Sequence, residues 1–232
     1  MRHILVVDNN LHVPCQRCSR FTYGIDGEEV TVVRPLKEGL PKDLAPYTHI
    51  VLSGSAGQIE KHDKLFKLLG PFIKKAAASK IPILGICYGH QAIVGAFSSA
   101  EAVTLSKQPE IGWVWIRRLN LKRSRLFHGL PRHFWAIASH IHEATTAPDD
   151  FIITASSKRC RIEAIEHTSL PIFGVQFHPE SGPYRLHKIL RYWQRHRTNQ
   201  DWYTDQALND RHFSPKLEHK IFRNFYNTKP GL

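Results

Sequence analysis

Short apolar runs bounded by polar and turn-forming residues recur along most of the chain. They predict strands at residues 3–8, 29–33, 50–52, 81–86, 134–138, 152–155, 161–165 and 172–177. From residue 59 to residue 79 the apolar side chains instead recur at helical spacing, with lysines facing away from them. Strands therefore alternate with a helix early and follow one another closely later. This order predicts one α/β domain over residues 1–232, with a mostly parallel sheet, flanking helices and antiparallel additions.

Length and composition place the chain among ordinary globular proteins. Its 232 residues are 42% hydrophobic and 22% charged, so a core can form without a disulfide or a metal. The longest apolar runs, such as residues 81–87, are far shorter than the roughly 18 to 20 residues of a membrane span, and His3 and Asp8 interrupt any signal peptide. Four cysteines do not form a disulfide framework in a chain this long. We therefore expect a cytoplasmic protein with reduced thiols and no membrane segment.

The chain is basic, with a formal net charge of +12. Residues 181–232 contain ten lysines and arginines against four acidic residues, which is half of that excess in under a quarter of the chain. A basic surface favours polyanions in general, but no motif of a nucleic-acid-binding domain accompanies it. A solvated basic face is the simpler interpretation, and a nucleic-acid partner is not expected.

A cysteine stands where a predicted strand runs directly into a predicted helix. The sequence there reads Gly85-x-Cys87-x-Gly89, the cysteine analogue of a nucleophile elbow. The small flanking residues let the backbone turn back on itself, and a helix N-terminus favours a thiolate and can hold an oxyanion. This motif predicts a nucleophile at Cys87, whereas the alternative is a buried structural cysteine between two close-packing glycines.

A second candidate group follows the last predicted strand, in Gly174-Val-Gln-Phe-His178-Pro-Glu180. Attack by a thiol on an acyl carbon needs a base, and the base needs an orienting carboxylate. His178 and Glu180 have these chemistries, although a histidine before a proline is often only a turn residue. Because Cys87 and His178 each follow a strand, they can converge on one edge of the sheet.

Together the two motifs resemble those of the class I glutamine amidotransferases, of the glutaminase type found in GMP synthase and anthranilate synthase. That family carries a G-x-C-x-G-x-Q elbow and a distal H-P-E. The likeness extends to Leu52-Ser-Gly-Ser55, similar to the family's oxyanion loop, and to Ala138-Ser-His140, similar to its glutamine-binding loop. It covers residues 3–180 and a closing helix at 215–226, leaving residues 182–214 as an insertion. The resemblance implies a flavodoxin-like three-layer sandwich.

The resemblance also implies a role for each matching residue. Cys87 is the nucleophile, His178 the general base and acid, and Glu180 the acid that orients it. The backbone N–H groups of Ser55 and Tyr88 form the oxyanion hole. The glutamine is held by four residues: Gly54, Gln91, Ser139 and His140.

Two positions depart from the family pattern. Ser55-Ala56-Gly57 stands where the family usually has a second glycine and then proline, and Ile141 stands where a glycine often follows the loop histidine. These departures concern the preformed oxyanion hole and the substrate pocket, and they leave the triad intact.

The resemblance implies an enzyme that releases ammonia from glutamine, without cofactor or metal, for a partner synthetase. The motif G-x-x-x-x-G-K-[ST] of phosphate-binding loops does not occur, so the ammonia acceptor is expected on another polypeptide. A stand-alone γ-glutamyl hydrolase uses the same triad and remains an alternative. A second alternative is a non-catalytic module that binds a partner through its basic C-terminal segment.

Other candidate residues carry weaker signals. Cys15 and Cys18 form a CxxC, half of a zinc or redox motif, and Cys160 has no cysteine nearby to complete it. His140 and His142 would share one face of a strand, where a metal pair is possible but a pocket or surface role is simpler. The tryptophans at positions 113, 115 and 135 most simply fill core or interface positions.

The insertion at residues 182–214 interleaves basic and aromatic residues. Leu186, Ile189, Leu190 and Trp193 fall at helical spacing and predict a helix packed on the domain. Arginine and tyrosine concentrate binding energy at protein interfaces, so the charged side of this helix is our candidate docking surface for the synthetase. Its basic residues include Arg191, Arg195 and Arg197.

Overall fold

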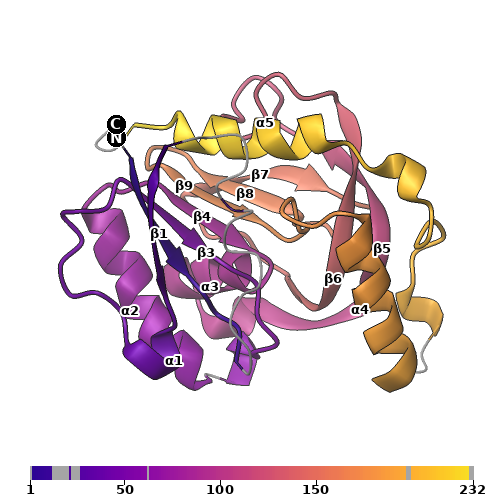
Figure 1. The fold of residues 1–232 in the computed structure, drawn as a ribbon, viewed down its shortest axis with the longest axis horizontal. Coiled ribbons are helices and arrows are strands. Elements are labelled where there is room, and N and C mark those ends of the chain that lie inside the picture. Colours follow the sequence, from indigo (N-terminus) through magenta and orange to yellow (C-terminus); the bar gives the residue numbers. More distant parts are fainter. Residues whose placement is uncertain (1, 12–20, 22–26, 62, 197–199, 230–232) are drawn as a thin grey trace.

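A computed structural model describes residues 2–11, 21, 27–61, 63–196 and 200–229. Within them, a nine-stranded sheet has the order β2-β1-β3-β4-β9-β8-β7-β5-β6 (Figure 1). The strands are β1 His3–Val7, β2 Glu29–Val33, β3 His49–Leu52, β4 Ile83–Ile86, β5 Val103–Arg118, β6 His133–Ala144, β7 Phe151–Ser156, β8 Ala164–His167 and β9 Ile172–Val175. The α-helices are α1 Pro35–Glu38, α2 Lys64–Ala78, α3 Tyr88–Phe97, α4 Pro183–His196 and α5 Pro215–Tyr226. Among the described residues, no helix has the length and apolarity needed to cross a membrane.

The sheet is parallel in one half and antiparallel in the other. The neighbours from β2 through β1, β3 and β4 to β9 pair in parallel. From β9 through β8, β7 and β5 to β6 every pairing is antiparallel. The α/β fold is as predicted, but the expected mostly parallel sheet is correct only for the first half of the strand order. The physical reason is that short turns rather than helices join β7, β8 and β9, and short turns can connect only antiparallel neighbours.

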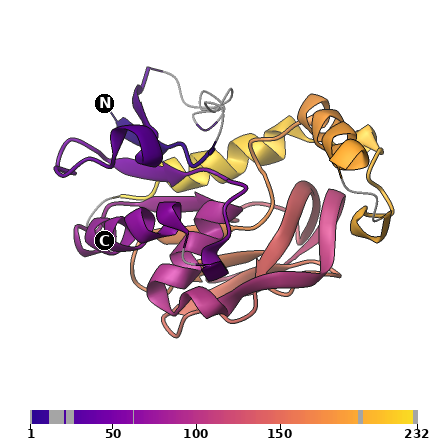
Figure 2. The same cartoon turned by 90° about the horizontal axis from the view of Figure 1, so that it is seen from below.

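The parallel strands are buried on both faces, which explains their continuous apolar sequences. Along β1, Leu5 and Val7 face a core shared with α2 and α3, whereas Ile4 and Val6 face a core shared with α5. Figure 1 shows α5 on the side of the strands away from α2 and α3, and Figure 2 shows the same arrangement after a quarter turn. These three layers agree with the expected sandwich.

Helix α2 begins where Asp63 caps it. The Asp63 carboxylate accepts the backbone N–H of Phe66 at 2.7 Å, and the apolar face of the helix then packs on the sheet. Helix α5 spans residues 215–226, the range expected for the closing helix, and packs through Ile221, Phe222 and Phe225.

The insertion forms helix α4, as its apolar spacing predicted. Leu186, Ile189 and Leu190 are buried against Ile111, Trp113 and Ile137 of the β5–β6 hairpin, where they form a third core. Hydrogen bonds also hold the segment that follows α4. Arg159 donates to the backbone carbonyls of Asp201 and Tyr203 at 2.7 and 3.2 Å. The insertion therefore packs against the β5–β6 hairpin as part of the same domain.

Strand β5 is the one long element that the apolar pattern did not predict. Its sequence is interrupted by Lys107, Gln108 and Pro109, and its pairing with β6 is irregular between Leu105 and Glu110. Only Arg117 and Arg118 of β5 pair with β7, so most of β5 pairs with β6 alone among the described strands. Helix α4 packs against this hairpin.

Candidate active site

Cys87 lies between β4 and α3 in a strained backbone conformation. Its φ of 53° and ψ of −105° are rare for a residue with a side chain. The predicted need for small neighbours is confirmed: a Cβ on Gly85 would lie 2.4 Å from the carbonyl oxygen of Gly89, and a Cβ on Gly89 would lie 2.4 Å from that of Leu52. The two glycines let α3 start directly against β3 and β4, which holds the thiol at the sheet edge.

His178 and Glu180 follow β9, the strand beside β4. Nδ1 of His178 lies 2.7 Å from Oε1 of Glu180, and their side chains are only 14% and 10% exposed. The backbone N–H of His178 donates to the carbonyl of Ile137 at 2.7 Å, which anchors this segment to β6. Cys87, His178 and Glu180 therefore meet at one edge of the sheet, as their sequence positions predicted.

The electrostatics of the pair favour a charged imidazole. Burial alone would lower the pKa of His178, but Glu180 and Cys87 outweigh it and raise this pKa to about 10. Burial would likewise raise the pKa of Glu180, but the imidazolium holds it below the usual carboxyl value. The site can therefore hold a proton on His178 beside the sulfur of Cys87.

The loop after β3 closes over these groups. A Cβ on Gly54 would lie 3.1 Å from Cε1 of His178 and 3.5 Å from Cβ of Cys87, so Gly54 borders both side chains. Asn9, which follows β1, fixes the neighbouring Ser53 through two hydrogen bonds. The backbone N–H of Asn9 donates to Oγ of Ser53 at 2.9 Å, and its Nδ2 donates to the Ser53 carbonyl at 2.7 Å.

The predicted oxyanion-hole residues lie at this corner. Ser55 is in the loop after β3, and Tyr88 is the first residue of α3, where helix N–H groups point beyond the helix end. The departure at Ser55-Ala56-Gly57 is accommodated by close packing, because a Cβ on Gly57 would lie 2.6 Å from both Asp63 Oδ2 and Tyr88 Cε2. The Tyr88 hydroxyl also donates to Asp63 at 2.9 Å, which joins the start of α2 to α3.

A buried glutamine that the sequence reasoning did not single out contacts the thiol. Gln176, two residues before His178, has no exposed surface and donates through Nε2 to Sγ of Cys87 at 3.6 Å. Its Oε1 accepts from Nε2 of Gln91 at 3.1 Å, and Gln91 also donates to the backbone carbonyl of His142 at 2.9 Å. The available signal was a polar residue inside an otherwise apolar strand sequence.

Two predicted glutamine-binding residues lie in a strand, so the expectation of a loop there is wrong. Ser139 and His140 are in the middle of β6, which is extended by its pairing with β5. Oγ of Ser139 accepts from Nε1 of Trp193 on α4 at 3.4 Å. The His140 ring is buried on the other face, with Nε2 3.3 Å from Oε2 of Glu110. Contact of either residue with glutamine remains a prediction.

The other cysteines and the tryptophans singled out in the sequence differ in their surroundings. Cys15 and Cys18 lie outside the described residues. Cys87 and Cys160 are buried free thiols. Trp113 is buried and Trp135 packs in the third core, as expected, but Trp115 is 48% exposed.

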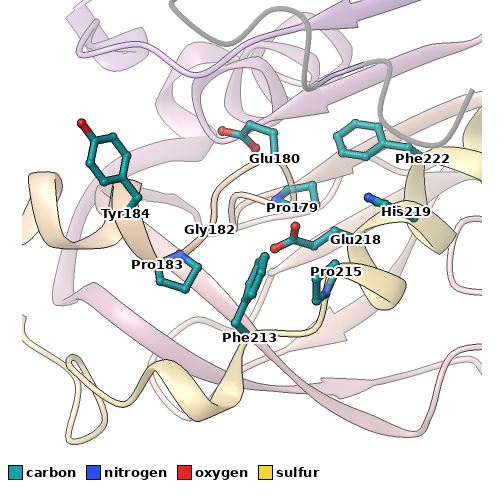
Figure 3. A pocket seen from close by; sticks show the side chains of 10 residues that line it. All are labelled: Pro179, Glu180, Gly182, Pro183, Tyr184, Phe213, Pro215, Glu218, His219 and Phe222. Atoms are coloured by element: carbon teal, nitrogen blue, oxygen red, sulfur yellow. The ribbon is translucent and has the colours of Figure 1, made fainter. Parts of the chain in front are cut away.

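A pocket of about 210 Å³ borders Glu180. Figure 3 shows Glu180 and Pro179 on one side and residues of α5, including Glu218, His219 and Phe222, on the other. Pro183 and Tyr184 at the start of α4 complete its wall. The pocket thus lies beside Glu180, where the insertion meets the closing helix.

Comparison with known proteins identifies the family to which the sequence is similar. Residues 22–194 match the family described as glutamine amidotransferase class-I. Over 118 residues the chain is 41% identical to a subunit of the glutamine-hydrolysing GMP synthase of Methanococcus aeolicus, covering 48% of this chain and 61% of that protein. Over 100 residues it is 43% identical to the corresponding subunit of Thermococcus kodakarensis, covering 43% and 51%. The chain thus matches between half and two thirds of the length of these relatives.

Solved structures share the fold. A protein of Thermoplasma acidophilum, described as a candidate subunit of GMP synthase, is 27% identical, with a TM-score of 0.70 over 97% of this chain and 92% of that one. A glutamine amidotransferase of Thermotoga maritima has a TM-score of 0.76 at 19% identity, over 97% and 96% of the two chains. The expected α/β fold is therefore shared with these structures over 97% of the chain, although the sheet is parallel only in its first half.

Proposed function

The chain belongs to the class-I glutamine amidotransferase family, and we propose on this basis that it hydrolyses the side-chain amide of glutamine and supplies ammonia to a partner synthetase. The observation that carries the proposal is the convergence of a strained Cys87, its histidine and an ion-paired carboxylate at one sheet edge. Nucleophile, base and orienting acid are the three groups that acyl transfer through a thioester requires.

In the proposed reaction the Cys87 sulfur attacks the amide carbon of glutamine. The C–S bond forms as the carbonyl π electrons move to oxygen, and N–H groups of Ser55 and Tyr88 stabilise this oxyanion. His178 then gives its proton to the amide nitrogen, so the C–N bond breaks and ammonia leaves. A water, deprotonated by His178, attacks the thioester and releases glutamate with the thiol restored. Every step uses groups of this chain, glutamine and water.

The raised pKa of His178 supports its place in this scheme. A histidine protonated beside Cys87 at neutral pH is prepared to donate to the leaving nitrogen. Glu180 stabilises that charge and fixes the ring, because its carboxylate accepts the Nδ1 proton at 2.7 Å. This bond leaves Nε2 for the sulfur and the substrate.

For the glutamine pocket we propose the edge formed by Gly54 and the middle of β6. Gly54 borders both Cys87 and His178, so its missing side chain leaves room for the substrate at the reacting atoms. Gln91 and His140 are used in buried contacts, which supports a role in shaping this edge. Direct contact of glutamine with Gly54, Gln91, Ser139 or His140 stays a prediction.

The partner is proposed from the same comparison. The relatives are named as subunits of a synthase, which supports an ammonia-accepting synthetase on a separate polypeptide. Free thiols at Cys87 and Cys160 support the reducing environment of a cytoplasm.

The Cys87→Ala variant tests the reaction. Glutamate release from glutamine should fall by more than about a thousandfold, because the nucleophile is gone, while the unfolding midpoint stays near that of the wild type. Labelling by a glutamine-like diazo-ketone should mark Cys87 in the wild type and be absent in the variant. A Cys18→Ala variant is the matched control and should keep both activity and label. Glutaminase activity of the wild-type level in Cys87→Ala would remove Cys87 from the mechanism.

A further inference from the structure

Four ionisable side chains from different segments meet in the interior, away from the triad. They come from β5, from β6, from the turn after β7 and from the residue before β8, and we refer to them as the buried cluster: Glu110, His140, Cys160 and Glu163. Each residue is at most 3% exposed, and one ligand atom from each lies within 4.8 Å of all the others. Residues of this kind are rarely fully buried without a compensating partner.

The second ring nitrogen of His140 faces a buried carboxylate. Nδ1 of His140 lies 3.1 Å from the backbone carbonyl of His142, which can only accept, so Nδ1 carries a proton. Nε2 lies 3.3 Å from Oε2 of Glu110, and neither of these two atoms has a hydrogen-bond partner among the described residues. Either a proton on Nε2 or a cation between the two atoms would join them.

Glu163 adds a second unbalanced carboxylate. It has no exposed surface, and neither of its carboxylate oxygens has a hydrogen-bond partner in the described part of the chain. Burying an uncompensated carboxylate is costly, so either a proton or a cation has to neutralise the group. A proton on Glu163 would neutralise that one carboxylate, whereas a cation would balance both carboxylates of the cluster and also bind the sulfur of Cys160.

The kinds of ligand atom in the buried cluster indicate which cation it would bind. We propose that the buried cluster is a structural Zn²⁺ site, in which one thiolate sulfur, one imidazole nitrogen and two carboxylate oxygens make four ligands. These are the three side-chain classes that bind zinc, and four protein ligands with no open position are typical of structural sites. Tetrahedral zinc places neighbouring ligand atoms roughly 3.3–3.8 Å apart, so the cluster needs side-chain movements on the order of 1 Å to close around the ion.

The surrounding groups are arranged as in metal sites. The His140 ring donates its other N–H to a backbone carbonyl, the arrangement that orients metal-bound histidines. Oε1 of Glu110 accepts from Oγ of Ser157 at 2.8 Å, which turns Oε2 toward the cluster. The same Ser157 Oγ accepts the N–H of Cys160 at 2.9 Å and so fixes the turn that carries the thiol.

Zinc at this place would tie the antiparallel strands to the active-site strand. The carbonyl of Glu163 accepts the N–H of Gln176 at 2.8 Å, and Gln176 contacts the Cys87 sulfur. The hairpin of β5 and β6 pairs with the rest of the sheet through only two residues of β5, so an internal cross-link is useful there. The ion would hold β5 and β6 to the loop before β8, where only two residue pairs join β5 to β7.

Metal loading of the intact protein tests the site. Protein stripped with a chelator is titrated with Zn²⁺ and, as a coloured substitute, Co²⁺. We expect about one ion per chain, a thiolate-to-cobalt charge-transfer band, tetrahedral visible bands and a raised unfolding midpoint. Cys160→Ser should abolish the charge-transfer band. Glu163→Gln, which keeps shape, should weaken binding by at least about tenfold, since even outer-shell changes cost that much.

Matched controls separate this site from the other cysteines. The Cys15→Ser/Cys18→Ser double variant and Cys87→Ser should each keep the band and the stoichiometry. A band lost in the double variant and kept in Cys160→Ser would place the metal at the CxxC and overturn the proposal. Absence of any ion in the wild type, together with a Glu163→Gln variant as stable as the wild type, would show that the cluster holds a proton instead.

Discussion

Among single side chains, the pair of His178 and Glu180 determines how the site responds to pH. Replacing Glu180 by glutamine keeps the shape and removes the charge, so the pKa of His178 should fall from about 10 toward its ordinary range. The imidazolium is then less available to protonate the leaving nitrogen. We expect kcat/KM for glutamine to fall by less than in Cys87→Ala, with a lower alkaline limit of the pH profile. A profile unchanged across pH would make Glu180 a structural residue.

The same substitution should change stability in a defined pH window. The folded pKa of His178 lies above the unfolded value of 6.5, so its contribution is full below that value and is lost as pH rises toward about 10. The pKa of Glu180 is lowered in the folded state, so its contribution is full above the ordinary value of 4.5 and is lost in acid. The stability difference between wild type and Glu180→Gln should therefore peak between these two ordinary values. Urea unfolding at several pH values measures it.

Gln176 provides another residue-level prediction, because its amide contacts the sulfur of Cys87, the proposed nucleophile. Gln176→Met keeps the length and removes the hydrogen bond to the Cys87 sulfur, which lies at 3.6 Å. Hydrogen bonds to charged groups contribute about 1.5–3 kcal/mol, so kcat should fall roughly tenfold to a hundredfold. Alkylation of Cys87 should slow as well, which a purely structural role would not predict. Exposed Gln194→Met on α4 is the control; equal kinetics in both variants would exclude a positioning role.

Residues within one short motif were predictable, and residues joined only by the fold were not. Cys87, His178 and Glu180 each belong to a local pattern with a chemical meaning. Glu110 and His140 are opposite each other across β5 and β6, but that register follows an irregularity after Leu105 that no sequence period reveals. The buried cluster therefore becomes visible only once the strands are paired.

At the scale of elements, alanine substitutions at Gly89 and Gly54 should have different effects. The first should mainly lower stability, and the second should mainly lower activity. Gly89→Ala places a Cβ 2.4 Å from the Leu52 carbonyl, a backbone atom that cannot move away, so we expect destabilisation of about 1–3 kcal/mol or more. Gly54→Ala places a Cβ 3.1 Å from the His178 ring, so activity should fall with little loss of stability. Urea unfolding and glutaminase assays distinguish the two.

Gly70→Ala in α2 is the control for both glycine variants. Its nearest neighbour would be 3.8 Å away, an ordinary contact, and alanine favours a helix over glycine by about 1 kcal/mol. It should leave activity unchanged and stability equal or higher. If Gly54→Ala were as active as Gly70→Ala, Gly54 would not border the reacting groups in solution.

Elements were predictable where one physical signal dominates. Strands β1, β3, β4 and β9 are buried on both faces and read as apolar runs, and the apolar stripe of α4 predicted its packing. Strand β5 was missed because polar residues interrupt it, and because its pairing with β6 and its packing against α4 are tertiary contacts. For the same reason the region of Ser139 and His140 was expected as a loop, whereas pairing with β5 makes it a strand.

For the whole molecule, the antiparallel half of the sheet was the feature least accessible from sequence. Alternating strands and helices indicate parallel pairing, but the number of strands added after α3, and their order, depends on tertiary contacts. The position of the insertion is a second such feature. Its helix α4 begins at the pocket beside Glu180, where Pro183 and Tyr184 form part of the wall.

The position of α4 bears on the prediction that its basic side docks the synthetase. Leu186, Ile189 and Leu190 face the third core, so Arg191 and Arg195 are left exposed on the other side of the helix. Arg197, which belongs to the same predicted surface, lies outside the described residues. A synthetase bound to the exposed side would reach the pocket next to the triad acid. Ammonia released at Cys87 would then form close to the interface with its acceptor.

Charge reversal on this surface tests the docking prediction. Arg191→Glu with Arg195→Glu should leave glutamine hydrolysis by the isolated chain unchanged, since neither residue lies among those that border Cys87 or His178. It should weaken co-purification with the synthetase, and stimulation by it, by at least about tenfold, because arginines at interface centres contribute about 2 kcal/mol or more. Lys64→Glu with Lys67→Glu on α2 makes the same change in net charge away from α4 and should bind normally. Equal weakening by both pairs would indicate a general effect of charge, and normal binding by the α4 pair would place the partner elsewhere on the molecule.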